Sequence, residues 1–150
     1  MTEQCEIPAG NPDSPEIDEI LKTVKTIAVV GLSPAEDRPS YRVASYLKGH
    51  GYRIIPVRPA VKEILGERAF GDLTEIPADV IVDMVDIFRR AEDVMPVVEA
   101  AIARGDVRVI WMQEGIVNNA ARDAARAKGL TVVMDRCAMK EHRRMREERK

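Results

Sequence analysis

Five short apolar runs, each dominated by β-branched residues and hardly interrupted by polar ones, constrain the fold of this chain most strongly. A strand covered by helices on both faces forms such a continuous apolar run, whereas a half-solvated strand alternates apolar and polar residues. Between the runs lie longer stretches in which apolar residues recur at helical spacing. This alternation predicts repeated βαβ units and a parallel sheet. The predicted strands span residues 26–30, 52–57, 80–85, 107–112 and 130–134.

Helix-end residues support the same pattern. Ser14, Pro15 and Glu16 provide an N-cap, a first-turn proline and an acidic first turn, which together predict a short leading helix. Glycine is the residue that helix C-caps favour. The crossover helices are predicted at 40–50, 91–104 and 117–128, followed by Gly51, Gly105 and Gly129.

The predicted fold is α/β, a Rossmann-like, doubly wound, five-stranded parallel sheet with three layers and the strand order 3-2-1-4-5. The chain has 150 residues, of which 45% are hydrophobic, and this suffices for one domain with its own core. Residues 14–150 are predicted to form that domain. Residues 1–13 contain too few apolar side chains to be held in place, so they are predicted to be a flexible tail. The charged segment 138–150 is predicted to be a solvated helix.

Composition excludes several classes of function. The 23 basic and 25 acidic residues leave a net charge of -2, which disfavours a nucleic-acid partner. No apolar run reaches the roughly 18 residues that a membrane span needs. The polar start, residues 1–4, lacks a signal-peptide pattern, so we expect a cytoplasmic protein without a membrane partner. Cys5 and Cys137 show no paired spacing, which predicts free thiols and no metal site.

The first predicted strand is followed by a loop with the features of a phosphate site. Gly31 allows a ligand or another backbone segment to approach closely, and Ser33 and Arg38 add hydrogen-bond donors. The helix that starts near Ser40 presents free amide groups and the positive end of its dipole. An ordinary capped βα turn is the alternative interpretation of this loop.

The second predicted strand ends in cations. A nicotinamide dinucleotide site needs G-x-G-x-x-G after the first strand and an acidic residue near the end of the second, and this chain has neither. Arg58 and Lys62 instead favour a ribose that bears a phosphate, as in coenzyme A or NADP. The missing glycines disfavour NADP. Two solvated loop residues remain the alternative.

Two further loops complete the predicted edge. Phe88, Arg89 and Arg90 combine an aromatic ring with two cations that suit a pantetheine arm and a pyrophosphate, unless they are simply an exposed helix start. Gln113 and Glu114 place polar groups beside the next helix. No histidine or serine elbow lies in these loops, so we expect no catalytic residue. Cys137 has no base near it in the sequence, and we expect an inert thiol.

The ordered set of these segments resembles the small bacterial CoA-binding proteins, whose domain is similar to the N-terminal CoA-binding domain of the succinyl-CoA ligase α subunit. The resemblance covers about residues 24–145. Its segments are 30–34, 38–41, 51–52, 55–59, 64–66, 88–90, 111–116 and 133–137.

The resemblance implies that the chain binds CoA at the carboxyl ends of its strands. It implies direct contacts from Ser33, Pro34, Arg58, Lys62, Ile87 and Phe88, and it matches residues 113–116 to a Thr-Glu-Gly-Ile stretch of the ligase. Arg58 stands where asparagine is usual, and the ligase domain with the phosphohistidine has no counterpart in this sequence. The full set of expected cofactor-binding residues is Gly31, Leu32, Ser33, Pro34, Arg38, Ser40, Val57, Arg58, Pro59, Lys62, Ile87, Phe88, Arg89, Arg90, Gln113, Glu114, Gly115 and Ile116.

The sequence therefore predicts a protein that binds coenzyme A or an acyl-CoA without catalysis, as a carrier or a sensor. An NADP-dependent oxidoreductase domain and the CoA-binding subunit of an acyl-CoA ligase are the alternatives. Expected partners are the small-molecule ligand and either a second copy of the chain or a ligase partner chain.

Overall fold

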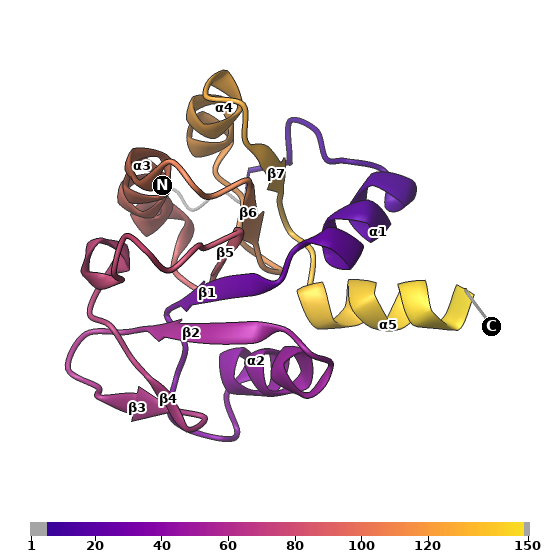
Figure 1. Cartoon of the computed structure of the whole chain (residues 1–150). Helices are drawn as coiled ribbons and strands as arrows, with labels where there is room; N and C mark the ends of the chain where they lie inside the picture. The colour runs from indigo at the N-terminus through magenta and orange to yellow at the C-terminus, as the bar shows by residue number, and fades with distance from the viewer. Residues whose placement is uncertain (1–5, 149–150) are drawn as a thin grey trace.

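The computed structural model, which describes residues 6–148, contains one five-stranded parallel sheet (Figure 1). This confirms the predicted doubly wound α/β class. Every strand pairs in parallel with its neighbours, and the short strands are almost entirely buried. The sheet consists of β1 (Thr26–Val30), β2 (Arg53–Val57), β5 (Met84–Ile87), β6 (Val109–Met112) and β7 (Thr131–Val133).

Helices cover both faces of the sheet and give the three predicted layers (Figure 1). Alternate strand residues point to opposite faces, so that Ile27 and Val29 of β1 enter one core and Ala28 and Val30 enter the other. The first core lies beneath α1 (Ser14–Thr23), α2 (Pro39–Gly49) and α5 (Ala138–Glu148). The second lies beneath the 3-10 helix η1 (Leu73–Glu75), α3 (Val94–Arg104) and α4 (Asn119–Ala127), and a further 3-10 turn, η2 (Ala91–Asp93), leads into α3.

The strand order differs from the predicted 3-2-1-4-5. The third parallel strand, β5, lies beside β1, so the order is β2-β1-β5-β6-β7. The outer edge of β2 is already occupied, because Phe70 bridges to Val57 and exchanges backbone hydrogen bonds with Pro56 and Arg58. A small hairpin, β3 (Glu63–Ile64) and β4 (Glu67–Arg68), leads the chain to that position. The order therefore reverses between β1 and β5, and a doubly wound sheet binds ligands where its order reverses.

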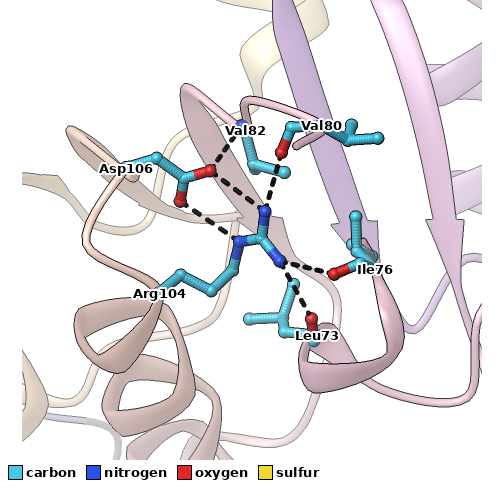
Figure 2. Close-up of polar contacts among 6 residues, drawn as sticks. All are labelled: Leu73, Ile76, Val80, Val82, Arg104 and Asp106. Atoms are coloured by element: carbon cyan, nitrogen blue, oxygen red, sulfur yellow. Dashed lines mark hydrogen bonds and ion pairs between the residues drawn. The ribbon is translucent and has the colours of Figure 1, made fainter. Parts of the chain in front are cut away.

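The third strand also begins later than predicted, at Met84 instead of residue 80. The preceding residues are apolar, but side chains bind their backbone. Arg104, at the end of α3, donates to the Val80 carbonyl oxygen (2.8 Å), and Asp106 accepts from the Val82 amide (3.0 Å; Figure 2). Val82 is buried and Ile81 is exposed, so this apolar run has the composition of a strand but not its hydrogen-bond ladder.

Arg104 ties several segments together. Its guanidinium also donates to the carbonyl oxygens of Leu73 (3.4 Å) and Ile76 (2.9 Å) and pairs with Asp106 (3.0 Å; Figure 2). The Arg104 side chain is only 9% exposed, so the pair is largely shielded from water. Burial alone raises the pKa of Asp106, but the hydrogen bonds from Arg104 and the Val82 amide outweigh it and hold the pKa below its ordinary value.

Residues 6–13, for which the composition predicts part of a flexible tail, contact the domain. The Asn11 side chain donates to the Met134 carbonyl oxygen and accepts from the Met134 amide, both at 2.8 Å. Asn11 thereby hydrogen-bonds to the end of β7 as a neighbouring strand would. Residues 1–5, including Cys5, lie outside the described residues. No helix among residues 6–148 is long and apolar enough to cross a membrane.

Candidate functional site

The loops after β1 and β5 cross at the point where the strand order reverses. Gly31 has a φ of 86°, and a Cβ built on it would lie 2.3 Å from the Phe88 carbonyl oxygen. The Gly31 amide donates to the Val57 carbonyl oxygen (2.9 Å), and the Phe88 amide donates to the Val30 carbonyl oxygen (2.8 Å). Glycine is required here for its conformation and for the close approach. The crossing fixes both loops at the carboxyl edge of the sheet.

The N-terminus of α2 faces this edge. Ser40 is 5% exposed, and its Oγ accepts from the Ser33 amide (2.9 Å), which holds the loop against the helix. Arg38 occupies the N-cap position but makes no side-chain capping bond. The first-turn amides of α2 therefore have no capping side chain, which is the arrangement that helix N-termini present to anions.

Three cavities lie along the carboxyl edge. The first, called here the Arg58 pocket, has a volume of about 330 Å³ and is lined by Gly31, Ser33, Arg38, Pro39, Ser40, Arg58 and Phe88. The second, the Cys137 pocket, has about 630 Å³ and is lined by Pro39, Arg42, Val43, Phe88, Arg89, Arg90, Gln113, Glu114, Ile116, Cys137, Met139 and Lys140. The third, the η1 pocket, has about 230 Å³ and is lined by Val30, Val57, Pro59, Gly71, Asp72, Leu73, Arg89, Asp93, Pro96, Val97 and Ala100.

Shared walls join the three cavities. Pro39 and Phe88 line both the Arg58 pocket and the Cys137 pocket. Arg89 lines both the Cys137 pocket and the η1 pocket. A long ligand that spans the edge therefore meets a continuous series of hollows.

Four of the arginines that line the cavities have no acidic partner among the described residues. Arg38, Arg42, Arg58 and Arg89 form no ion pair with any carboxylate of residues 6–148. The Arg58 guanidinium makes one long contact, 3.5 Å, with the Leu32 carbonyl oxygen. Such cations attract phosphates, because a guanidinium binds phosphate oxygens in a bidentate manner.

The Cys137 pocket is built where β6 meets α5. The Gln113 side chain, 4% exposed, accepts from the Ala138 amide (3.1 Å). The Trp111 indole donates to the Arg136 carbonyl oxygen (2.8 Å). Lys140 of α5 pairs with Glu114 at 3.0 Å, and both side chains are more than half exposed. These contacts fix the start of α5 as a wall of the pocket.

A buried carboxyl lies in the middle of the sheet. Asp86 of β5 is fully buried between Val29 and Trp111 in the sheet register, and neither carboxyl oxygen has a hydrogen-bond partner among the described residues. Burial raises the pKa of Asp86 well above its ordinary value, which favours the neutral form of the side chain. Asp86 lines none of the three cavities.

Most of the expected cofactor-binding residues line the cavities. Five of them do not. Leu32 and Ile87 are fully buried in the two cores, Pro34 and Lys62 are exposed outside the pockets, and the Gly115 amide donates to Asp135 (2.7 Å). Ile87 was placed after the strand by the sequence, but it is the last residue of β5.

The sequence analysis missed the walls that helices provide. Arg42 and Val43 of α2 line the Cys137 pocket. They follow Pro39, the first residue of α2, at helical spacing and so lie on the same face of the helix. This spacing could have predicted them as lining residues. Met139 and Lys140 lie in the segment that the sequence predicts to be a solvated helix, and Cys137, just before it, is predicted to be an inert thiol. Nothing in their local pattern distinguishes that helix from one that borders a site.

Among residues 6–148 there is no group of three His, Cys, Asp or Glu side chains arranged to hold a metal ion. The site is therefore described by its cations, its helix N-terminus and its apolar hollow.

Known proteins match most of the chain. The family model described as "CoA binding domain" matches residues 25–143. An uncharacterised protein of Bacillus subtilis, YneT, is 44% identical over 132 residues, covering 88% of this chain and 96% of that protein.

Solved structures share the fold. A hypothetical protein from Pyrococcus horikoshii is 36% identical with a TM-score of 0.86, and the match covers 97% of this chain and 99% of that one. The apo form of the dinucleotide forming acetyl-coenzyme A synthetase 1 of Candidatus Korarchaeum cryptofilum is 22% identical, with a TM-score of 0.63 over 72% of this chain and 25% of that chain. This second likeness is one of fold.

Proposed function

The chain belongs to the CoA-binding domain family, and from this premise we propose that it binds coenzyme A or an acyl-CoA across the carboxyl edge of its sheet, without breaking a bond in it. Its location is proposed to be cytoplasmic, and a carrier or sensor role is proposed for the binding.

The observation that carries this proposal is the set of four arginines without acidic partners around three joined cavities. Coenzyme A bears a 3'-phosphate and a pyrophosphate, so its charge is spread over a long molecule. Arg38 and Arg58 line one cavity, Arg89 lies between two others, and the uncapped N-terminus of α2 faces the first. Cations distributed along the edge suit a ligand whose phosphates are separated.

The chemistry of the cavities suggests how the ligand is oriented. We place the phosphates at the Arg58 pocket and beside Arg89, where charge is concentrated. The pantetheine arm then extends over Phe88 into the Cys137 pocket, whose lining is mainly apolar through Val43, Phe88, Ile116 and Met139. Its volume of about 630 Å³ leaves room for an acyl group at the thiol end.

Calorimetry with CoA, acetyl-CoA and NADP tests the proposal. We expect CoA and acetyl-CoA to bind and NADP to bind far more weakly, because the first loop lacks the glycines that admit a dinucleotide pyrophosphate. Binding of NADP that is tighter than binding of CoA would overturn the proposal and favour the oxidoreductase alternative.

Arg58 is predicted to recognise the 3'-phosphate. Removal of a charge-assisted contact costs about 1.5–3 kcal/mol, so Arg58→Ala is expected to weaken CoA binding by roughly ten-fold to a hundred-fold. Dephospho-CoA, which lacks that phosphate, is expected to bind the variant and the wild type almost equally. Arg53→Ala is the matched control, because Arg53 is exposed at the opposite end of β2. Equal losses of affinity for CoA and dephospho-CoA would show that Arg58 does not recognise the 3'-phosphate.

The proposed lack of catalysis has its own test. Cys137 is buried and borders the pocket that is proposed to hold the thiol end of the ligand. Incubation of the protein with acyl-CoAs and with oxidised CoA, followed by measurement of free CoA and of protein mass, compares wild type with Cys137→Ser. Steady turnover would refute the binding-only proposal. A single adduct that depends on Cys137 would change only the role assigned to the thiol.

A further inference from the structure

The two histidines of the chain, His50 and His142, meet at the interface between α2 and α5. They are separated by 91 residues of sequence, but their ring centroids are 5.0 Å apart. The Tyr46 hydroxyl lies 2.9 Å from His142 Nδ1, and the Tyr46 ring lies 4.2 Å from the His50 ring. His142 is 7% exposed. The two helices are therefore joined through a histidine pair and a tyrosine.

The neighbours of the histidine pair are mostly cationic or neutral. On α5, Arg146 Nη1 lies 3.5 Å from His50 Nδ1, and the Arg143 guanidinium lies 5.2 Å from the centre of the Tyr46 ring. Tyr52, which precedes β2, lies 5.7 Å from the His142 ring and donates its hydroxyl to the Leu21 carbonyl oxygen of α1. Burial and Tyr46 raise the pKa of Tyr52 to about 12, so Tyr52 is neutral at any relevant pH.

The nearby acids of this interface are already engaged elsewhere. Asp18 of α1 and Glu141 of α5 both pair with Arg144, at 2.7 Å and 3.0 Å. No carboxylate of residues 6–148 forms an ion pair or a hydrogen bond with His50 or His142. A proton gained by His142 would thus lie in a poorly hydrated position beside His50 and Arg146, with no acid to offset it.

The same two helices form walls of the Cys137 pocket. Arg42 and Val43 belong to α2, and Met139 and Lys140 belong to the first turn of α5. His142 follows Lys140 by two residues, and α5 packs against both α1 and α2. A change in how α5 sits on α2 therefore changes the shape of the proposed ligand site.

We propose that His50 and His142 form a pH-sensitive latch between α2 and α5, which loosens in mildly acidic medium and lowers the affinity of the Cys137 pocket for its ligand. The ligand part rests on the proposed function, whereas the loosening of α5 does not. Burial and like charge drive the change, since a protonated His142 is better hydrated, and lies farther from the charge of His50 at the end of α2, when α5 moves away from α2.

The direction of the pH effect follows from linkage. Burial, then His50 and Arg146, lower the pKa of His142 in the docked helix, so the undocked helix binds protons more readily. Docking of α5 on α2 is fully favoured above the ordinary histidine pKa of about 6.5. It weakens as the pH falls from there through the lowered pKa of the docked state, and below that value it weakens no further.

The ligand-free protein provides the first test. Nuclear magnetic resonance gives the titration midpoints of the two imidazoles, and hydrogen exchange gives the protection of residues 138–148 at about pH 8 and about pH 5.5. Relative to His142→Gln, and after correction for the intrinsic pH dependence of exchange, the wild type is expected to lose at least about three-fold more protection in α5 on acidification. A His142 midpoint at or above about 6.5, or equal loss of protection in both proteins, would overturn the latch.

The second test measures the affinity for CoA at the same two pH values. The phosphates of CoA titrate near pH 6 themselves, so the informative quantity is the loss of affinity in wild type divided by the loss in His142→Gln. A ratio of at least about three supports the latch, and a ratio of one overturns its ligand part. Absence of CoA binding at either pH would refute the proposed function, and the exchange experiment would still decide the loosening of α5.

Two further variants protect the test against a folding defect. Tyr46→Phe removes the hydroxyl that lies beside His142 Nδ1 and keeps both histidines. A hydroxyl that donates to the unprotonated nitrogen stabilises the neutral ring, so in that arrangement its loss is expected to raise the midpoint of His142. His50→Gln removes one neighbour whose charge lowers the pKa of His142, so it is also expected to raise that midpoint. A titration midpoint of His142 that is unchanged in both variants would overturn the proposed coupling of His142 to Tyr46 and His50.

Discussion

Gly31 is the residue on which the geometry of the site depends most directly. Its backbone lies in the left-handed region and passes against the Phe88 carbonyl group, at the crossing of two loops that both line cavities. A side chain at this position would push apart the segments that follow β1 and β5. Stability and ligand binding are therefore linked through one missing Cβ atom.

Gly31→Ala is predicted to destabilise the protein more than Gly129→Ala. Both glycines have a φ of 86°, but a Cβ at Gly129 meets no atom within 4 Å. The left-handed conformation costs either alanine about 1–2 kcal/mol, and overpacking adds about 1–3 kcal/mol at Gly31 alone. Urea denaturation measures the difference, and calorimetry is expected to show weaker CoA binding only for Gly31→Ala. Equal free-energy losses would mean that the loops accommodate the methyl group.

Asp86 predicts an unusual pH dependence of stability. Its raised pKa means that the folded state binds a proton more readily than the unfolded chain. The contribution of Asp86 to the free energy of unfolding is complete below the ordinary carboxyl pKa of about 4. It is lost as the pH rises toward the raised pKa of the folded state, at up to about 1.4 kcal/mol per pH unit. Asp86→Asn removes this titration. Unfolding free energies across this range are expected to favour the variant increasingly as pH rises, and parallel curves for the two proteins would contradict the assignment.

At the scale of elements, the contacts of Arg104 with Leu73, Ile76, Val80 and Asp106, called here the Arg104 clamp, hold the segment between η1 and β5 against α3. The segment has no regular secondary structure, so its carbonyl groups depend on the guanidinium (Figure 2). Leu73, which the clamp contacts, lines the η1 pocket. The clamp therefore supports one of the three proposed ligand cavities from behind.

Arg104→Met is predicted to cost about 3–5 kcal/mol of unfolding free energy, because it leaves Asp106 and several carbonyl groups without their partner. Arg108→Met is the matched control. Arg108 is 52% exposed and lies 3.8 Å from Asp83, so its loss is expected to cost less than about 1 kcal/mol. Thermal and urea denaturation of both variants provide the comparison, and similar losses would show that the clamp contributes little.

The elements differ in how well the sequence predicts them. The strand at 26–30 is predicted with its observed bounds, because a short, continuous run of β-branched residues is typical of a buried parallel strand. The position of β5 beside β1 depends on Phe70 closing the outer edge of β2, a contact between distant residues that no local pattern encodes. The wall formed by α5 is hidden for the same kind of reason, since Met139 and Lys140 resemble any charged helix start.

At the scale of the whole molecule, each edge of the sheet is covered at its carboxyl end. Phe70 pairs beside β2, and Asn11 bonds with its side chain to the residue that follows β7. Open edges favour pairing with other chains, so these two closures oppose association through the sheet.

Asn11→Ala is predicted to leave the Met134 amide and carbonyl groups without a partner and to cost about 1–3 kcal/mol. The exposed edge is also expected to promote association, which analytical ultracentrifugation measures at increasing concentration. Glu6→Ala serves as the control, because it removes an exposed contact of the same segment, to the Asn119 amide (2.9 Å), and leaves the edge closed. An Asn11→Ala protein with the stability and mass of the control would show that the edge needs no cover.

The walls of the Cys137 pocket are formed by α2 and α5, which begin nearly a hundred residues apart along the chain. During synthesis the sheet strands emerge before α5 does. A nascent chain that has released β7 thus holds all the strands and lacks one wall of its ligand site. Ligand binding is therefore a late property of the growing polypeptide, acquired after the fold that supports it.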